Sequence, residues 1–273
     1  MPSIFLILLS CCLFLSTPSR AQEQKKPAPE NILFVGNSLT YVNNLPAVFD
    51  AFAKQNQRNT QSYMLVEGGA TLTERWQDQW VAKALSERRY DVVILQERGG
   101  DVMGSFGDQA ELESEQSVLK LRELILAHGA KAIYLGTYQP KATSSKVLHQ
   151  AEIALTKKIG IAYVAITPLL EIGQKQFPLA PWLHADRAHP GSALTLLQAM
   201  SLYRHVFGEE IETQGFTVNA PIYDKNGGLP LQVLSSQTAF SGKVLANEKQ
   251  YSDKDVKMMR AIFNLQNDRK KSD

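Results

Sequence analysis

Short, uninterrupted apolar runs that recur along the chain constrain its fold more than any other feature. Each run has the length of a β-strand, and each is continuous rather than alternating, as expected for strands that are covered on both faces. The runs lie at 32–35, 63–66, 92–95, 132–135 and 162–166. Because longer amphipathic segments separate them, the pattern predicts an α/β protein with a parallel sheet.

The amphipathic segments between the runs predict the helices of that fold. They lie at 46–55, 72–86, 109–128 and 146–159. Gly129 and Gly160 follow the last two, at the position where a helix ends in the left-handed conformation. We expect a further helix at 190–207, with proline in its first turn, and another at 251–265. A frayed charged tail is expected at 267–273. The sequence thus predicts a three-layer α/β/α sandwich around a five-stranded parallel sheet.

Residues 1–21 are interpreted as a cleaved signal peptide rather than as part of the fold. The segment 4–15 is almost wholly apolar but too short to span a membrane comfortably. Ser19 and Ala21 are small residues at the two positions that a signal peptidase recognises. We therefore expect export, either to the periplasm or out of the cell. Lipid attachment at Cys11 is the alternative.

The rest of the chain is expected to form one domain. With 44% apolar residues, about 250 residues are enough for one sizeable core. We expect a flexible lead-in at 22–30, the main domain at 31–208 and a C-terminal extension at 209–273 that packs on it. Both cysteines, Cys11 and Cys12, lie in the signal peptide, so the exported form has neither a disulfide nor a thiol nucleophile. The formal net charge of +2 gives no indication of a nucleic-acid partner.

Polar residues and a glycine follow the first three apolar runs, at what would be the carboxyl edge of the sheet. Ser38 follows the first run, either as a nucleophile or as part of a helix cap. Gly69 follows the second run. Its backbone N–H can face an oxyanion, or the glycine can simply belong to an ordinary turn. Gln96 follows the third, where its amide can donate to an oxyanion or to the loop. Glu97 and Arg98 next to it are expected to pair and fix this loop.

A distant acid and imidazole complete the set of groups that nucleophilic catalysis needs. Asp186 and His189 are three residues apart, so the carboxylate can hold the Nδ1–H of the imidazole and leave Nε2 as a general base. A surface loop with an incidental ion pair is the ordinary alternative. A metal site of His184, Asp186 and His189 is another, although no His-x-x-x-His or Glu-x-x-His helix accompanies these residues.

In this order, the motifs resemble those of the SGNH (GDSL-like) hydrolase superfamily. The segment 36–40 (GNSLT) resembles the first block, with asparagine in place of the usual aspartate. The segment 69–71 resembles the second block, and 186–189 matches the Asp-x-x-His block. The third block, usually Gly-x-Asn-Asp, is replaced at 95–97 by Leu-Gln-Glu, so glutamine stands in for the asparagine. The resemblance covers about 31–207 and is greatest to exported bacterial members with Gly-Asn-Ser, Gly-Gly-x-Thr-Leu and Leu-Gln-Glu.

The resemblance implies a flavodoxin-like sandwich with esterase, lipase or deacetylase chemistry and no cofactor. By position, Ser38 is the nucleophile, His189 the general base and Asp186 the acid that orients the base. The oxyanion hole takes the backbone N–H groups of Ser38 and Gly69 and the side-chain amide of Gln96. No metal is expected.

From this resemblance we expect a serine esterase that removes short acyl groups, above all acetyl, from a small-molecule or carbohydrate ester. Tyr41, Tyr138 and Trp182 near the motif loops are candidates for stacking on a sugar ring, although a loop aromatic more often serves packing. An O-acyltransferase with the same triad and a non-catalytic glycan-binding module on the same fold are the alternatives. We expect neither a nucleic-acid partner nor stable membrane insertion after signal cleavage.

Overall fold

The computed structural model describes residues 30–208, 214–240 and 244–272. The expected signal peptide, Cys11 within it, and all of the lead-in except Glu30 lie outside the described residues. None of the described helices is both long and apolar enough to cross a membrane.

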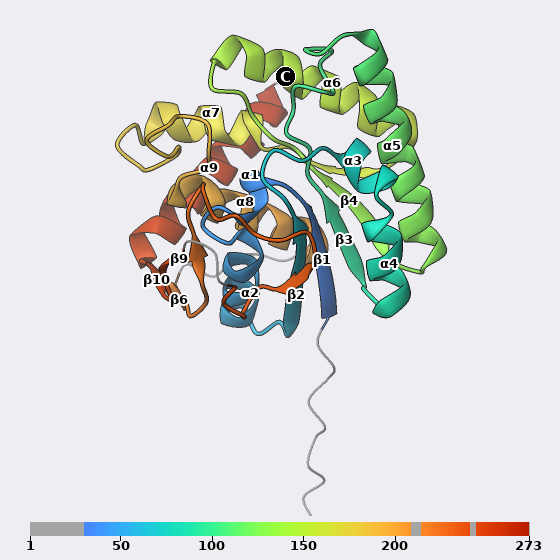
Figure 1. Ribbon diagram of the computed structural model, residues 1–273. Coiled ribbons are helices and arrows are strands. Elements are labelled where there is room, and N and C mark those ends of the chain that lie inside the picture. Colours follow the sequence, from blue (N-terminus) through green and yellow to red (C-terminus); the bar gives the residue numbers. More distant parts are fainter. Residues whose placement is uncertain (1–29, 209–213, 241–243, 273) are drawn as a thin grey trace, which may run out of the picture.

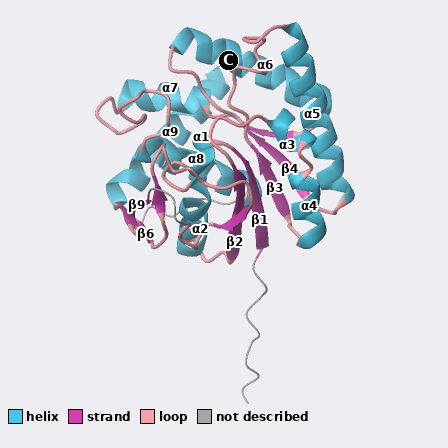
Figure 2. Cartoon of the chain, viewed as in Figure 1, coloured by secondary structure: helices cyan, strands magenta, loops and turns pink. Residues whose placement is uncertain are grey.

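A mostly parallel sheet forms the middle layer of a three-layer α/β/α sandwich (Figure 1 and Figure 2). Among the described residues the sheet has six strands in the order β5-β4-β3-β1-β2-β8. Those that run parallel are β1 (Glu30–Gly36), β2 (Thr60–Val66), β3 (Val92–Leu95), β4 (Lys131–Leu135) and β5 (Ala162–Val164). These are the strands that the apolar runs predict, and the predicted α/β/α sandwich is confirmed.

The sixth strand is a correction to the predicted five-stranded parallel sheet. β8 (Val233–Ser235) comes from the C-terminal part of the chain and runs antiparallel to β2. Its three residues are too few for a strand period to be recognised in the sequence. β8 covers the edge of β2 that a five-stranded sheet would leave open.

Helices cover both faces of the sheet (Figure 1). One face carries α2 (Leu45–Gln55), α7 (Thr167–Gln176), α8 (Ser192–Phe207) and α9 (Asp253–Ser272). The other carries α3 (Leu72–Gln77), α4 (Trp80–Glu87), α5 (Asp108–Ala127) and α6 (Ala142–Ile159). A single helical turn, α1 (Ser38–Tyr41), follows β1 directly.

The central strand β1 is apolar because both of its faces are covered. Ile32 and Phe34 belong to the core beneath α2, whereas the two residues that alternate with them belong to the core beneath α5. None of these four side chains is more than 1% exposed. The strand runs from Glu30 at the amino edge of the sheet to Gly36 at its carboxyl edge. The first polar side chains after this run therefore emerge at the carboxyl edge.

Two predicted helices differ from the structure at identifiable residues. The predicted helix 72–86 is broken between α3 and α4, where Gln79 adopts a left-handed φ of 61°. There the Asp78 carboxylate accepts the N–H that begins α4, at 2.9 Å. Pro190 precedes α8 instead of lying in its first turn, because it forms an isolated β-bridge with Leu183.

The end of the chain is helical beyond its predicted boundary. α9 continues to Ser272, so the frayed tail expected at 267–273 is wrong for the residues described. Val256 and Ile262 on one side of α9 are fully buried and anchor it to the sandwich. Gly129 and Gly160 follow α5 and α6 in the left-handed conformation that the sequence predicts, with φ of 77° and 65°.

Residues 214–272 pack on the same sandwich. Phe216, in β6 (Phe216–Val218), contacts Phe52 of α2 with ring centroids 5.5 Å apart. β6 pairs with β10 (Lys249–Tyr251), and β7 (Ile222–Tyr223) pairs with β9 (Val244–Ala246). Tyr223 also forms a bridge with Val42, just past α1. The C-terminal part therefore lies against the segment that follows β1.

Asp50 of α2 joins three parts of the fold through its buried carboxylate. Its Oδ1 accepts the hydroxyl groups of Thr60 and Ser62, each at 2.7 Å. Its Oδ2 accepts the Ser62 N–H and the Ser236 hydroxyl, each at 2.9 Å. Burial raises the pKa of Asp50 above its usual value, although these donors act in the opposite direction. The hydrogen bonds fix α2 to β2 and to the residue that follows β8.

Replacing Asp50 with alanine should lower the free energy of unfolding by about 2–4 kcal/mol, because buried donors lose their acceptor. Asp50→Asn keeps one acceptor oxygen and should lose less. Urea unfolding of both variants and of the wild type, followed by circular dichroism, measures the difference. An Asp50→Ala variant within about 0.5 kcal/mol of the wild type would contradict this role.

Candidate active site

Asn37 fixes the turn that follows β1. Its Oδ1 accepts the N–H of Leu39 at 3.0 Å and so caps α1. Its Nδ2 donates to the carbonyl of Ala70 at 3.1 Å. An aspartate can accept the first bond but cannot donate the second, which gives a physical reason for asparagine at this position. Ser38, the first residue of α1, is thereby held at the carboxyl edge of the sheet.

Gln96 lies directly after β3 and is buried. Only the oxygen of its side-chain amide makes a hydrogen bond. Thr40 Oγ1 donates to Gln96 Oε1 at 2.6 Å, and Gln96 is 1% exposed. Among the described side chains its Nε2 finds no acceptor. A Cβ on residue 36 would collide with the Thr40 hydroxyl, so the glycine at the end of β1 leaves room for this contact. Gln96 therefore has a buried, unpaired amide donor beside α1.

Gly69 lies in the exposed turn after β2. Its φ of 76° is a conformation that glycine adopts without strain, and the turn is closed by the Ala70 N–H, which donates to the Glu67 carbonyl at 3.2 Å. Within the part of the chain that the structure describes, neither the Gly69 N–H nor the Ser38 N–H donates to a protein acceptor. Two backbone donors are thus available at this edge.

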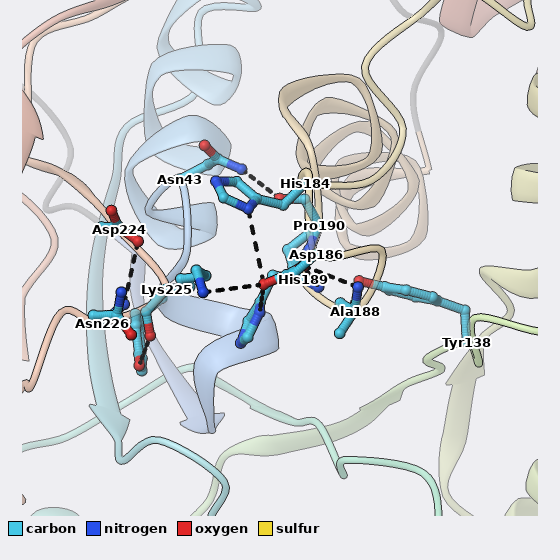
Figure 3. A network of polar contacts seen from close by, with 11 residues as sticks. Asn43, Tyr138, His184, Asp186, Ala188, His189, Pro190, Asp224, Lys225 and Asn226 are labelled. Atoms are coloured by element: carbon cyan, nitrogen blue, oxygen red, sulfur yellow. Dashed lines mark hydrogen bonds and ion pairs between the residues drawn. The ribbon is translucent and has the colours of Figure 1, made fainter.

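Asp186 and His189 form the hydrogen-bonded pair that their spacing suggests (Figure 3). His189 Nδ1 lies 2.8 Å from Asp186 Oδ2. Asp186 Oδ1 accepts the backbone N–H groups of Ala188 at 3.0 Å and of His189 at 3.1 Å. Partial burial raises the pKa of Asp186, but the two backbone donors and the imidazole outweigh it and hold the pKa well below its usual value. The carboxylate therefore fixes the proton at Nδ1 and leaves Nε2 as an acceptor.

Two further hydrogen bonds hold the loop that carries this pair (Figure 3). The Tyr138 hydroxyl donates to the Ala188 carbonyl at 2.9 Å, and Asn43 Nδ2 donates to the Pro190 carbonyl at 2.8 Å. Asn43 lies two residues past α1, so its bond places the loop beside the segment that begins with Ser38. The structure thus brings the predicted nucleophile, acid and base to one edge of the sheet.

Two more side chains approach the same carboxylate. His184 Nδ1 and Lys225 Nζ each lie 3.8 Å from Asp186 Oδ2, which is too far for a hydrogen bond. Lys225 belongs to the turn after β7, and no motif in the sequence indicates its place. The described residues contain no group of three His, Cys, Asp or Glu side chains arranged to hold a metal ion. The metal site considered from His184, Asp186 and His189 therefore has no geometric support.

Glu97 and Arg98 do not form the ion pair that their positions suggest. The Glu97 carboxylate is buried and accepts the N–H groups of Leu72 and Arg98, each at 2.9 Å. The Arg98 guanidinium instead pairs with Asp101 through two bonds of 2.8 and 2.9 Å. Burial raises the pKa of Glu97 to about 8 despite the N–H of Arg98, and the charge of Asp101 adds to the rise. Glu97 therefore fixes the end of β3 to the start of α3.

The aromatic residues near the motif loops are buried, which supports the ordinary role in packing rather than the stacking on a sugar ring for which they are candidates. Tyr41 and Tyr138 are each 3% exposed, and Trp182 is 4% exposed. Their polar atoms all donate to backbone carbonyl groups. Phe106, which the sequence does not single out, is 60% exposed in the loop after β3. The Arg98 guanidinium lies 4.7 Å from the centre of its ring.

Comparison with solved structures identifies the fold as that of the SGNH hydrolases. A candidate SGNH hydrolase from Slackia heliotrinireducens is 22% identical, with a TM-score of 0.53 over 66% of this chain and 100% of that one. A variant of the acetyl xylan esterase Axe2 from Geobacillus stearothermophilus is 16% identical, with a TM-score of 0.52 over 67% and 97%. A DUF4886 family protein from Bacteroides uniformis is 12% identical, with a TM-score of 0.50 over 67% and 84%.

The resemblance that the motifs suggest is therefore confirmed at the level of the fold. No protein-family model matches the sequence, and no curated protein matches it. Each of these structures covers 66% or 67% of this chain, so the remainder has no counterpart in them.

Glu97 should make the stability of the protein depend on pH. Its pKa is about 8 in the folded protein and about 4.3 in an unfolded chain. The folded state therefore binds the proton more tightly, so the stabilisation is complete below about pH 4 and is lost as the pH rises towards 8. Glu97→Gln should flatten this decline by up to about 1.4 kcal/mol per pH unit.

Denaturant unfolding of the wild type and Glu97→Gln between about pH 5 and about pH 8 measures this effect. Burial likewise raises the pKa of Glu152 to about 8. This second carboxyl group contributes equally to both proteins, so the difference between them isolates Glu97. If the stabilities of the wild type and Glu97→Gln depend on pH in the same way, the raised pKa of Glu97 is ruled out.

Proposed function

We propose that the protein is a serine esterase of the SGNH type. The observation that carries the proposal is the hydrogen bond of 2.8 Å between Asp186 and His189, in a loop fixed beside the segment of Ser38. A carboxylate bonded to Nδ1 of an imidazole makes Nε2 a general base for a nearby hydroxyl group. Ester hydrolysis then needs only the nucleophile and donors for the oxyanion.

In the first step, Ser38 Oγ attacks the acyl carbon of the ester while His189 Nε2 takes the hydroxyl proton. The carbonyl oxygen becomes an oxyanion, to which the Ser38 and Gly69 N–H groups and Gln96 Nε2 donate. When the tetrahedral intermediate collapses, the alcohol leaves with the proton from Nε2 and an acyl-enzyme remains. Water then gives a proton to the same imidazole and attacks the acyl carbon, which releases the carboxylic acid and restores Ser38.

Gln96 suits the role of an oxyanion donor because its amide is already oriented. The Thr40 hydroxyl fixes Oε1 at 2.6 Å, and Nε2 has no acceptor among the described side chains. A donor that is fixed and desolvated before the reaction stabilises developing charge without reorganisation. Glutamine can thus replace the asparagine that SGNH hydrolases carry in their third sequence block.

A short acyl group on a larger alcohol is the substrate that we place first. The side chains of His189 and Asp186 are 22% and 24% exposed, so the edge is open to an ester on a bulky alcohol. One protein of the same fold is described as an acetyl xylan esterase, and export, predicted from residues 1–21, would bring this protein to extracellular polymers. An acetylated carbohydrate is therefore the proposed substrate class. Transfer of the acyl group to another alcohol would change only the acceptor that replaces water.

Ser38→Ala should reduce kcat for p-nitrophenyl acetate by at least about 10³-fold, because the nucleophile is removed. Its free energy of unfolding should stay within about 0.5 kcal/mol of the wild type, because Ser38 is only partly buried. Hydrolysis of p-nitrophenyl acetate and octanoate by both proteins measures the reaction, and acetate should be the faster substrate. Unchanged turnover in Ser38→Ala would end the serine mechanism. Failure of the wild type both to hydrolyse the esters and to react with a fluorophosphonate probe would favour a binding module.

Gln96→Ala should lower kcat by about 10²–10³-fold and change KM much less, as expected for a donor that acts in the transition state. Thr40→Val is the matched control, because it leaves the amide in place but removes the hydroxyl that orients it, and it should lower kcat by a smaller factor. Steady-state kinetics on p-nitrophenyl acetate separate the two parameters. A change confined to KM would instead make Gln96 a substrate contact.

A further inference from the structure

The C-terminal part of the chain reaches the proposed active site through the turn 224–227. The Gly227 N–H donates to the Asp224 carbonyl at 3.0 Å and closes this turn. The Tyr41 hydroxyl donates to the Lys225 carbonyl at 3.0 Å. Just ahead of the turn, the Tyr223 carbonyl accepts a backbone N–H at 3.2 Å from the loop between α1 and α2. The turn is therefore fixed to the segment that begins with the proposed nucleophile.

This turn places the ammonium group of Lys225 beside the carboxylate of Asp186 (Figure 3). Asp186 Oδ2 has three nitrogen neighbours, namely His189 Nδ1 at 2.8 Å and both His184 Nδ1 and Lys225 Nζ at 3.8 Å. At 3.8 Å the lysine is not hydrogen-bonded and acts on the pair through its charge. The Lys225 side chain is 36% exposed, so solvent weakens this effect but does not abolish it.

The other groups that face the pair do not cancel the charge of Lys225. Burial keeps the Tyr138 hydroxyl neutral, and the charge of Asp186 adds to this effect, so that its pKa lies well above its usual value. The Tyr41 pKa is likewise raised, first by burial and then by Asp224. Asp224 belongs to the turn and Arg187 to the loop of the pair, and their side chains are of opposite charge. His184, with Nδ1 3.8 Å from Asp186 Oδ2, is the further ionisable side chain near the pair.

We infer that Lys225 is a positioning residue that sets the pH range of the active site. Asp186 favours the protonated imidazole of His189, and the nearby ammonium of Lys225 opposes that effect. The charge of Lys225 therefore favours the neutral imidazole, which is the form that can take the proton of Ser38. The inference rests on the proposed function and extends it, because the C-terminal part of the chain then contributes a residue to the site.

The dependence of kcat/KM on pH tests this role. Lys225→Met keeps an unbranched side chain that is one atom shorter but removes the charge, and it should move the acid limb upwards by about half a pH unit. At pH values below the acid limb, kcat/KM should fall about threefold, whereas kcat/KM on the plateau at high pH should not fall. Lys225→Arg and Lys157→Met should both retain the wild-type profile. Lys157 is an exposed lysine on α6 and controls for the loss of one charge elsewhere.

A parallel loss of kcat/KM at every pH would overturn the inference, since that is the result of a merely structural role. A profile of Lys225→Met that superimposes on the wild type would overturn it as well.

A titration without substrate separates this inference from the proposed function. Proton NMR follows the Cε1–H signals of the five histidines, and His189→Gln identifies the signal of His189. The signal of His189 should titrate at a higher pH in Lys225→Met than in the wild type. A shifted pKa in a protein that hydrolyses no ester would reject the esterase and retain the effect of Lys225 on His189. An unshifted pKa in an active esterase would reject the role of Lys225 alone.

Discussion

The burial of β1 on both faces is the constraint on which the rest of the site depends. The strand lies between β2 and β3, and its side chains from 32 to 35 are at most 1% exposed, so it has no place for polar groups. Such groups appear only where the strands end, with Asn37 and Ser38 past β1 and Gln96 past β3. Since parallel strands end at one edge, these residues meet there although they are far apart in the sequence.

Side-chain amides then hold the loops of that edge together. Asn37 connects α1 to the turn after β2, and Asn43 connects the next segment to the loop of His189. Asn44 donates to the carbonyl groups of Pro221 and Ser236, each at 2.8 Å, and thereby joins the C-terminal part. An amide can donate and accept at once, which a carboxylate cannot do. Neutral cross-links of this kind add no charge of their own beside Asp186.

Most of the fold could be predicted because strands covered on two faces give a strong local signal, as the run 92–95 does for β3. The features that the sequence could not show depend on non-local pairing. β8 exists only through its contact with β2, and the position of Lys225 depends on a bond from Tyr41. Glu97 and Arg98 are neighbours in the sequence, but the Glu97 carboxylate accepts backbone N–H groups, and the Arg98 guanidinium pairs with Asp101 instead. The contact between Asp186 and His189 could be predicted from their spacing, because both residues lie within one turn of the chain.

β1 also decides the direction in which the proposed catalytic edge faces. Glu30 begins the strand at the amino edge, and Ser38 follows its carboxyl end, about 23 Å away for seven residues at about 3.3 Å each. In Figure 1 the chain enters β1 on the side of the sheet opposite to α1 and α3. An attachment made through residues ahead of β1, whether to a lipid or to another protein, would therefore join the molecule at the edge of the sheet opposite to Ser38. The proposed catalytic edge would then face away from the point of attachment.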